Sequence, residues 1–146
     1  MGTLSFARAL RSLGHVPMLG LLTLATWGSA ADMVVINAAS SINQLTDDQL
    51  KDVFLGKRTT WEDGSKVIVV VVKSGPSATA LLARLGKNSQ QFQTGWKKLV
   101  FTGKGSMPET AATDDAAVDF VSKTPGAITL VDATRIKDGV KSVTIR

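Results

Sequence analysis

The chain has 146 residues, and 17 Lys and Arg side chains against 12 Asp and Glu give it a formal net charge of +5 at pH 7. This length is typical of one domain with its own core, and its scattered lysines form no basic stripe of the kind that binds nucleic acid. The absence of cysteine excludes a disulfide framework. With His15 as the sole histidine, it also argues against a zinc site or a histidine-activated nucleophile.

Residues 1–31 have the pattern of a cleaved secretory signal peptide. Arg8 and Arg11 precede an apolar stretch at 16–27, and small residues follow it. The order positive, apolar, small is typical of signal peptides, and the stretch is shorter than the ~20 residues of a membrane-spanning helix. An uncleaved N-terminal anchor is the alternative. We therefore expect a periplasmic protein whose working domain is residues 32–146.

The first half of this domain predicts a strand, a helix and a second strand. Met33–Asn37 is short, apolar and β-branched, as in a buried strand. Thr46 followed by Gln49 fits a capping box, and the helix that it opens is expected to stop at Gly56. The unbroken apolar run Val67–Val72 predicts a strand that is covered on both faces.

The second half predicts three helices and two further strands. The expected helices have an apolar face and are Ala78–Leu85, Ser89–Val100 and Asp114–Lys123. The expected strands are Ala127–Val131 and Val140–Ile145, and a glycine-rich loop is expected at Phe101–Thr110. Strands that alternate with helices predict an α/β domain with a mixed or mostly parallel sheet flanked by helices.

The strongest candidate for a ligand site is the turn Lys73–Thr79, which joins the valine-rich strand to a helix. Ligands of open α/β sheets bind at the carboxyl ends of strands, and a helix N-terminus offers unpaired N–H groups to an oxyanion. Lys73 would add a positive charge, and Ser77 and Thr79 would add hydroxyl donors. The alternative is that Ser77 only caps the helix and Lys73 is only solvated.

Several stretches resemble, in order, the phosphate-binding proteins of phosphate ABC transporters, in the type II periplasmic binding protein superfamily. Val35–Asn37 is similar to the strand that crosses between the lobes of that family. Val53–Arg58 with Trp61 resembles its "IF-x-GK…W" segment, and Val71–Thr79 its strand–turn–helix "v-R-s-D-G-S-G-T". Thr124–Ile128 resembles its "tPGAI".

The resemblance implies a phosphate site at the positions that match the family's Arg, Ser, Gly and Thr, which are Lys73, Ser77, Ala78 and Thr79. Lysine in place of arginine loses the bidentate hydrogen-bonding geometry that suits phosphate. An alanine in place of glycine leaves less room for the anion to approach the backbone. Lys57 and Arg58 are candidate supports of an anion site, with a solvated charged loop as the alternative.

The resemblance also implies the fold of a single lobe, because family members have two lobes that close over the ligand and this chain matches mainly the second. We therefore expect weak binding unless a homodimer or a partner protein supplies the other wall. Trp61 and Trp96 are expected to be packing residues. Asp114 and Asp115, adjacent at a helix start, are expected to serve the helix dipole and not to form an acid–base pair.

These observations predict a non-enzymatic periplasmic domain without a cofactor. The first hypothesis is weak binding of a phosphate-like oxyanion for a transport or sensing system, in which a membrane transporter is a candidate partner. The alternative is a protein-interaction module that keeps the fold without binding a ligand.

Overall fold

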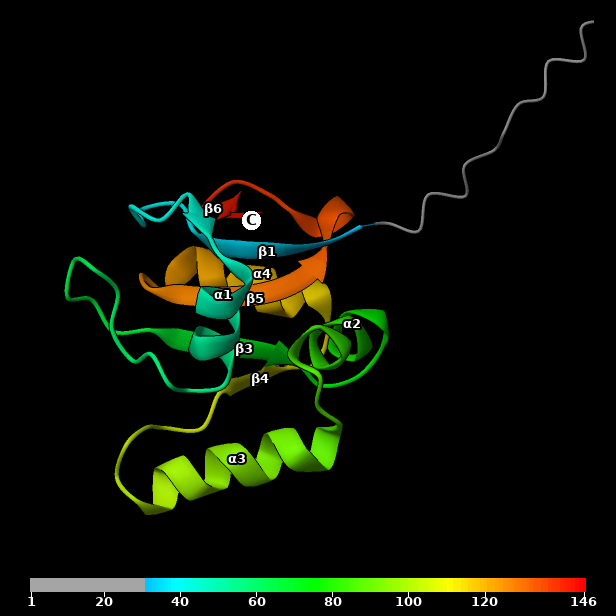
Figure 1. The fold of residues 1–146 in the computed structure, drawn as a ribbon. Coiled ribbons are helices and arrows are strands. Elements are labelled where there is room, and N and C mark those ends of the chain that lie inside the picture. Colours follow the sequence, from blue (N-terminus) through cyan, green and yellow to red (C-terminus); the bar gives the residue numbers. More distant parts are fainter. Residues whose placement is uncertain (1–30) are drawn as a thin grey trace, which may run out of the picture.

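The computed structural model describes residues 31–146, so the predicted signal peptide lies outside the described residues except for Ala31. The helices are α1 (Asp47–Phe54), α2 (Pro76–Leu85), α3 (Ser89–Phe101) and α4 (Asp114–Lys123), with a 3-10 turn at Ala133–Arg135. The strands are β1 (Asp32–Asn37), β2 (Gln44–Leu45), β3 (Ile68–Val72), β4 (Glu109–Ala111), β5 (Ala127–Asp132), β6 (Val140–Ser142) and β7 (Thr144–Ile145). Figure 1 shows their arrangement.

Five of these strands form one mixed sheet in the order β4-β3-β5-β1-β6. Strand β3 runs parallel to β4 and β5, whereas β1 runs antiparallel to β5 and β6. Strands β2 and β7 form a separate parallel pair. The predicted α/β class with a mixed sheet is confirmed, and the carboxyl ends of β3, β4 and β5 meet at one edge of the sheet.

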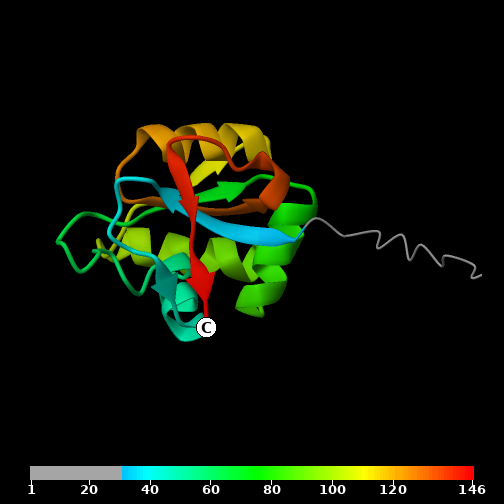
Figure 2. The same cartoon turned by 90° about the horizontal axis from the view of Figure 1, so that it is seen from above.

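Helices cover both faces of the sheet, which explains the unbroken apolar strands. Figure 2 shows α4 on one side and α1 and α2 on the other. Along β5, Ile128 and Leu130 belong to the cluster under α1, α2 and α3, while Ala127 and Val131 belong to the cluster under α4. Residues 31–146 form both clusters and the five-stranded sheet, so the described segment contains a hydrophobic core.

Capping chemistry sets the helix boundaries. Thr46 and Gln49 form the predicted capping box of α1, and α4 has the predicted bounds. Helix α2 begins two residues before its predicted start because Pro76 occupies its first turn, a position where proline is favoured. Among the described residues, no helix is long and apolar enough to span a membrane.

Two short strands depart from the predictions. Strand β4 lies at the end of the segment that was expected to be a loop, and two of its three residues are exposed, so no apolar run marks it. The predicted strand Val140–Ile145 divides at Val143 into β6 and β7, which belong to different sheets. The N–H group of Val143 donates to the carbonyl of Val34 at 2.9 Å.

The two predicted packing tryptophans are buried and hold loops to the core. Trp61 donates its indole N–H to the carbonyl of Gly126 at 2.9 Å, and Trp96 donates to the carbonyl of Phe54 at 3.0 Å. The ring of Trp96 also lies against Gly56, just after α1. Both tryptophans are therefore structural, as predicted.

Candidate functional site

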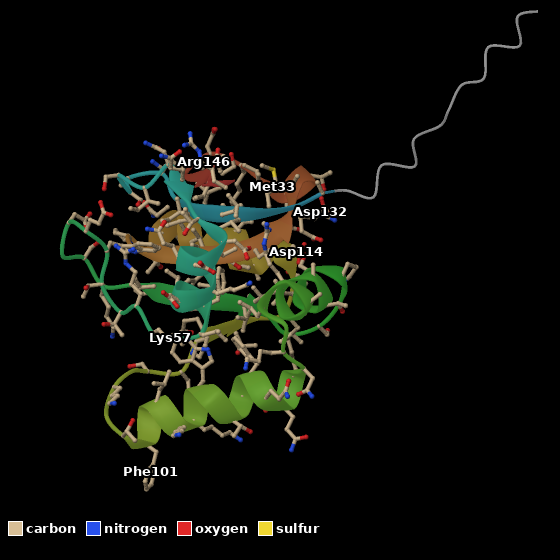
Figure 3. The ribbon with its side chains drawn as sticks, in the orientation of Figure 1. Met33, Lys57, Phe101, Asp114, Asp132 and Arg146 are labelled. Carbon is tan, nitrogen blue, oxygen red and sulfur yellow. The ribbon has the colours of Figure 1, made fainter. Side chains whose placement is uncertain are left out.

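The parallel strands bring three separate segments to one edge of the sheet. The turn after β3 lies beside the end of β4, because the N–H of Lys73 donates to the carbonyl of Ala111 at 2.8 Å. Helix α4 begins at Asp114, three residues after β4, and β5 ends at Asp132. Figure 3 shows Asp114 and Asp132 at this edge, near α2. The predicted ligand turn is thus part of a larger polar edge.

Helix α2 starts from this turn with an open N-terminus. Gly75 precedes the helix with φ of 98°, a backbone conformation that favours glycine, and Pro76 follows it. No side chain caps α2 within the described residues, whereas α1, α3 and α4 each have a side-chain cap. The first N–H groups of a helix have no intrahelical partner, so the start of α2 offers donors at the exposed turn.

Ser77 turns its hydroxyl away from this open end. The residue is 2% exposed, and its Oγ donates to Oδ2 of Asp114 at 2.6 Å. The same carboxylate oxygen accepts the N–H of Asp132 at 3.0 Å. Ser77 therefore does not cap α2, as one alternative held, but ties α2 to α4 and to the end of β5.

The other predicted ligand residues stay at the surface. Thr79 is exposed, and its hydroxyl donates to the carbonyl of Gly75 at 3.2 Å. Lys73 is exposed and Ala78 is half-buried. A groove of about 210 Å³ adjoins them, and besides Lys73 and Ala78 its lining is largely apolar, including Leu81, Leu82, Phe92 and Met107.

Three carboxylates lie at this edge, and the positive groups near them among the described residues include Lys73 and Arg135. Asp32 pairs with Asp132 across β1 and β5. Partial burial, followed by the nearby carboxylates of Asp132 and Asp114, raises the pKa of Asp32. The N–H and then the hydroxyl of Thr134 donate to Asp132 and lower its pKa, which Arg135 also helps to lower, so Asp132 holds its negative charge. This charge balance opposes tight binding of a multiply charged anion.

The structure does not bring Lys57 and Arg58 to this edge. Arg58 lies before the amino end of β3, donates from Nε to the carbonyl of Thr60 at 3.2 Å, and has its guanidinium 5.9 Å from the ring centre of Trp61. Lys57 is exposed, and Figure 3 shows it away from Asp114 and Asp132. The lysine and arginine thus fit the alternative of a charged loop.

The sequence model of the PBP superfamily domain matches residues 30–144. The chain belongs to this family. As a PBP superfamily domain it has the predicted α/β architecture. Residues 31–146 form no cluster of His, Cys, Asp and Glu side chains that could hold a metal ion.

Solved structures with the same fold are about twice as long as this PBP superfamily domain. One, described as a phosphate ABC transporter substrate-binding protein with bound phosphate from Clostridium perfringens, is 17% identical with a TM-score of 0.63, over 78% of this chain and 44% of that one. An ABC-type phosphate transport receptor from Vibrio cholerae is 15% identical with a TM-score of 0.62, over 78% and 45%. PstS from Borrelia burgdorferi is 15% identical with a TM-score of 0.61, over 80% and 47%.

Sequence reasoning missed the acidic members of the site in this PBP superfamily domain. Asp114 was expected only at a helix start, and its contact with Ser77 joins residues that are 37 positions apart. Asp32 and Asp132 were not singled out, because their proximity depends on the antiparallel pairing of β1 with β5. The parallel order of β3, β4 and β5 would have been the signal, since it brings the residues after these strands together.

Proposed function

We propose that this PBP superfamily domain is a non-enzymatic periplasmic binding domain that takes a phosphate-like oxyanion weakly at the N-terminus of α2. The observation that carries the proposal is the open, uncapped start of α2 beside the exposed Lys73, at the carboxyl edge of the parallel strands. Backbone N–H groups at a helix start and the positive end of the helix dipole favour an oxyanion there.

In this proposal the four predicted residues have different roles. Lys73 supplies charge, the N–H of Ala78 faces the anion, and Thr79 rotates its exposed hydroxyl from the carbonyl of Gly75 to the ligand. Ser77 acts indirectly, because its hydroxyl holds Asp114 in place. The bound phosphate named for the Clostridium perfringens structure supports phosphate as the first ligand to test.

Binding is proposed to be weak for two physical reasons. The carboxylates of Asp32, Asp114 and Asp132 repel an anion at the same edge, and a surface site is screened by water and salt. The chain also spans about half the length of the solved structures that it matches, and we propose that a second wall over the anion comes from outside residues 31–146, for example from a homodimer or a partner protein such as a transporter.

Isothermal titration of residues 31–146 with phosphate tests this proposal. We expect heat that fits a millimolar dissociation constant, and a loss of affinity of about fivefold in Lys73→Gln, since a surface ion contact contributes up to about 1 kcal/mol. Lys137→Gln removes an equal charge from a lysine that pairs with Asp119 on α4, and it should bind like the wild type. Equal affinity of Lys73→Gln and wild type would refute the assigned site.

The second candidate is a protein-interaction module that keeps the fold without a small ligand. The contact between Ser77 and Asp114 favours it, because the hydroxyl that the resemblance assigned to phosphate already donates its hydrogen bond to a carboxylate of the chain itself. This candidate predicts no heat even at tens of millimolar phosphate. Sedimentation equilibrium of the same segment would show whether it forms the homodimer that could supply a second wall.

A further inference from the structure

Two large apolar side chains are exposed side by side at the end of α3. They are Val100 and Phe101, with 39% and 93% of their surface exposed, and both lie in the last turn of the helix. Met107, 46% exposed in the loop that follows, lines the groove beside Lys73 and Ala78 instead. Isolated apolar side chains are common on protein surfaces, but an almost fully exposed phenylalanine beside a second apolar side chain indicates an interaction surface.

Lysines surround these apolar residues. Lys97 and Lys98 precede Phe101 on α3, and Lys104 follows it. We call these five residues the α3 tip: Lys97, Lys98, Val100, Phe101 and Lys104. None of the three lysines of the α3 tip forms an ion pair among the described residues. The sequence has no Asp or Glu between Gly64 and Pro108, so the tip stands in a stretch that carries only positive charge.

Backbone hydrogen bonds hold the α3 tip in one conformation at the end of the helix. The N–H of Gly103 donates to the carbonyl of Val100 at 3.1 Å and that of Lys104 to the carbonyl of Leu99 at 2.9 Å, with φ of 72° at Gly103. These are the two hydrogen bonds of a Schellman turn, and they hold Lys104 beside the end of the helix. Residues four apart share a helix face, so Lys97 lies next to Phe101. Figure 3 shows Phe101 pointing away from the body of the domain.

We propose that the α3 tip docks on an anionic phospholipid bilayer. The ring of Phe101 enters the boundary between headgroups and acyl chains, with Val100 beside it, while the lysines meet the lipid phosphates. A lipid surface needs no matching shape, whereas a stable protein interface buries about 800 Å² on each partner, far more than a protruding helix end offers. Lysines at a helix C-terminus also complement the helix dipole, but that role leaves the exposure of Phe101 unexplained.

Flotation with lipid vesicles tests the proposal on residues 31–146, which contain both core clusters. We expect this segment to float with vesicles that contain phosphatidylglycerol, to stay behind with pure phosphatidylcholine, and to be released by salt. Phe101→Ser should weaken the partition of the domain onto these vesicles about tenfold, because it removes the ring that becomes buried in the bilayer on docking. The double variant Lys97→Gln with Lys98→Gln should weaken the partition about 25-fold, since each lysine near an anionic surface contributes about fivefold.

A charge-matched control separates the tip from the net charge of the domain. The double variant Lys123→Gln with Lys137→Gln removes the same charge from α4 and the loop after β5, where both lysines pair with Asp119. It should float nearly as well as the wild type. The proposal is overturned if phosphatidylglycerol vesicles do not carry the domain or if Phe101→Ser floats unchanged. A dimer in sedimentation velocity that Phe101→Ser dissolves would assign the tip to a second copy and would also overturn it.

Discussion

At the scale of single residues, the polar edge depends on one carboxylate. Asp114 accepts hydrogen bonds from the hydroxyl of Ser77 and the N–H of Asp132, so it joins α2, α4 and β5. It also places a negative charge next to the donors of α2. In the proposed site the same residue therefore stabilises the edge and opposes the binding of an anion.

Replacing Asp114 with Asn separates these two effects. The amide oxygen still accepts both hydrogen bonds, while the negative charge is gone, so phosphate should bind about fivefold more tightly. Titration calorimetry measures the change, and a thermal melt checks that the fold is kept. Weaker binding in Asp114→Asn would indicate that the carboxylate assists the ligand and would contradict the opposing role assigned to it.

Thr129 is a second residue with a specific energetic consequence. It lies in β5, is fully buried, and its hydroxyl finds no hydrogen-bond partner within residues 31–146. An unpaired buried hydroxyl is destabilising, so Thr129→Val, which has nearly the same shape, should raise the free energy of unfolding by about 1 kcal/mol. Urea unfolding measures it, and Thr129→Ser, which keeps the hydroxyl and loses a methyl group, should be less stable than wild type. A loss of stability in Thr129→Val would show that the hydroxyl has a partner.

At the scale of elements, the carbonyl of Gly126 joins the starts of β3 and β5. It accepts the indole N–H of Trp61 and the N–H of Ile68, at 2.9 and 3.1 Å. Gly126 has φ of 84°, and a side chain there would collide with the carbonyl of Lys66. The tryptophan and the "PGAI" segment that carry the sequence resemblance thus have a shared structural role.

Gly126→Ala and Gly64→Ala form a matched pair, because Gly64 has φ of 83° but open space around it. Gly64→Ala should cost about 1 kcal/mol from backbone strain alone. Gly126→Ala adds the collision and should cost about 3 kcal/mol. Urea denaturation of both variants gives the difference, and equal losses would show that the close approach to Lys66 is not tight.

Sequence patterns predicted the elements better than their contacts. The capping box at Thr46 and the acidic residues at the start of α4 are local signals, so they predicted the starts of those helices correctly. Strand β4 was missed because it is held by pairing with β3 rather than by apolar residues of its own. The turn of the candidate site was predicted from the sequence. Two other features depend on the order of the strands in the sheet, which no local pattern encodes: the burial of Ser77 against Asp114, and the separation of Arg58 from this turn.

At the scale of the whole molecule, the acidic edge predicts a particular response to pH. The pKa of Asp32 is raised, so its ionised form is disfavoured in the folded state, and this loss of stability is present at neutral pH. It disappears as pH falls and Asp32 becomes protonated. Asp32→Asn should therefore be more stable than wild type at pH 7, and the difference should vanish below about pH 3, under the ordinary aspartate pKa of about 4.

Paired unfolding curves of Asp32→Asn and wild type across this range measure the effect. Asp47, Asp63, Asp119 and Asp132 have lowered pKa values, so both proteins should lose stability together as pH falls through the acid range. A gap between the two proteins that stays constant down to low pH would mean that the charge of Asp32 is not its cause.

We infer that this domain, which spans about half the length of the solved structures that it matches, offers an anion site at the start of α2. Amide chemical shifts of residues 31–146, followed by NMR during a phosphate titration, test it most directly because they report on each N–H group. We predict saturable shifts at Ser77, Ala78 and Thr79 with a millimolar midpoint, and this midpoint should move to about fivefold higher phosphate in Lys73→Gln. Unmoved amides at these three positions, or saturable shifts only elsewhere, would contradict it.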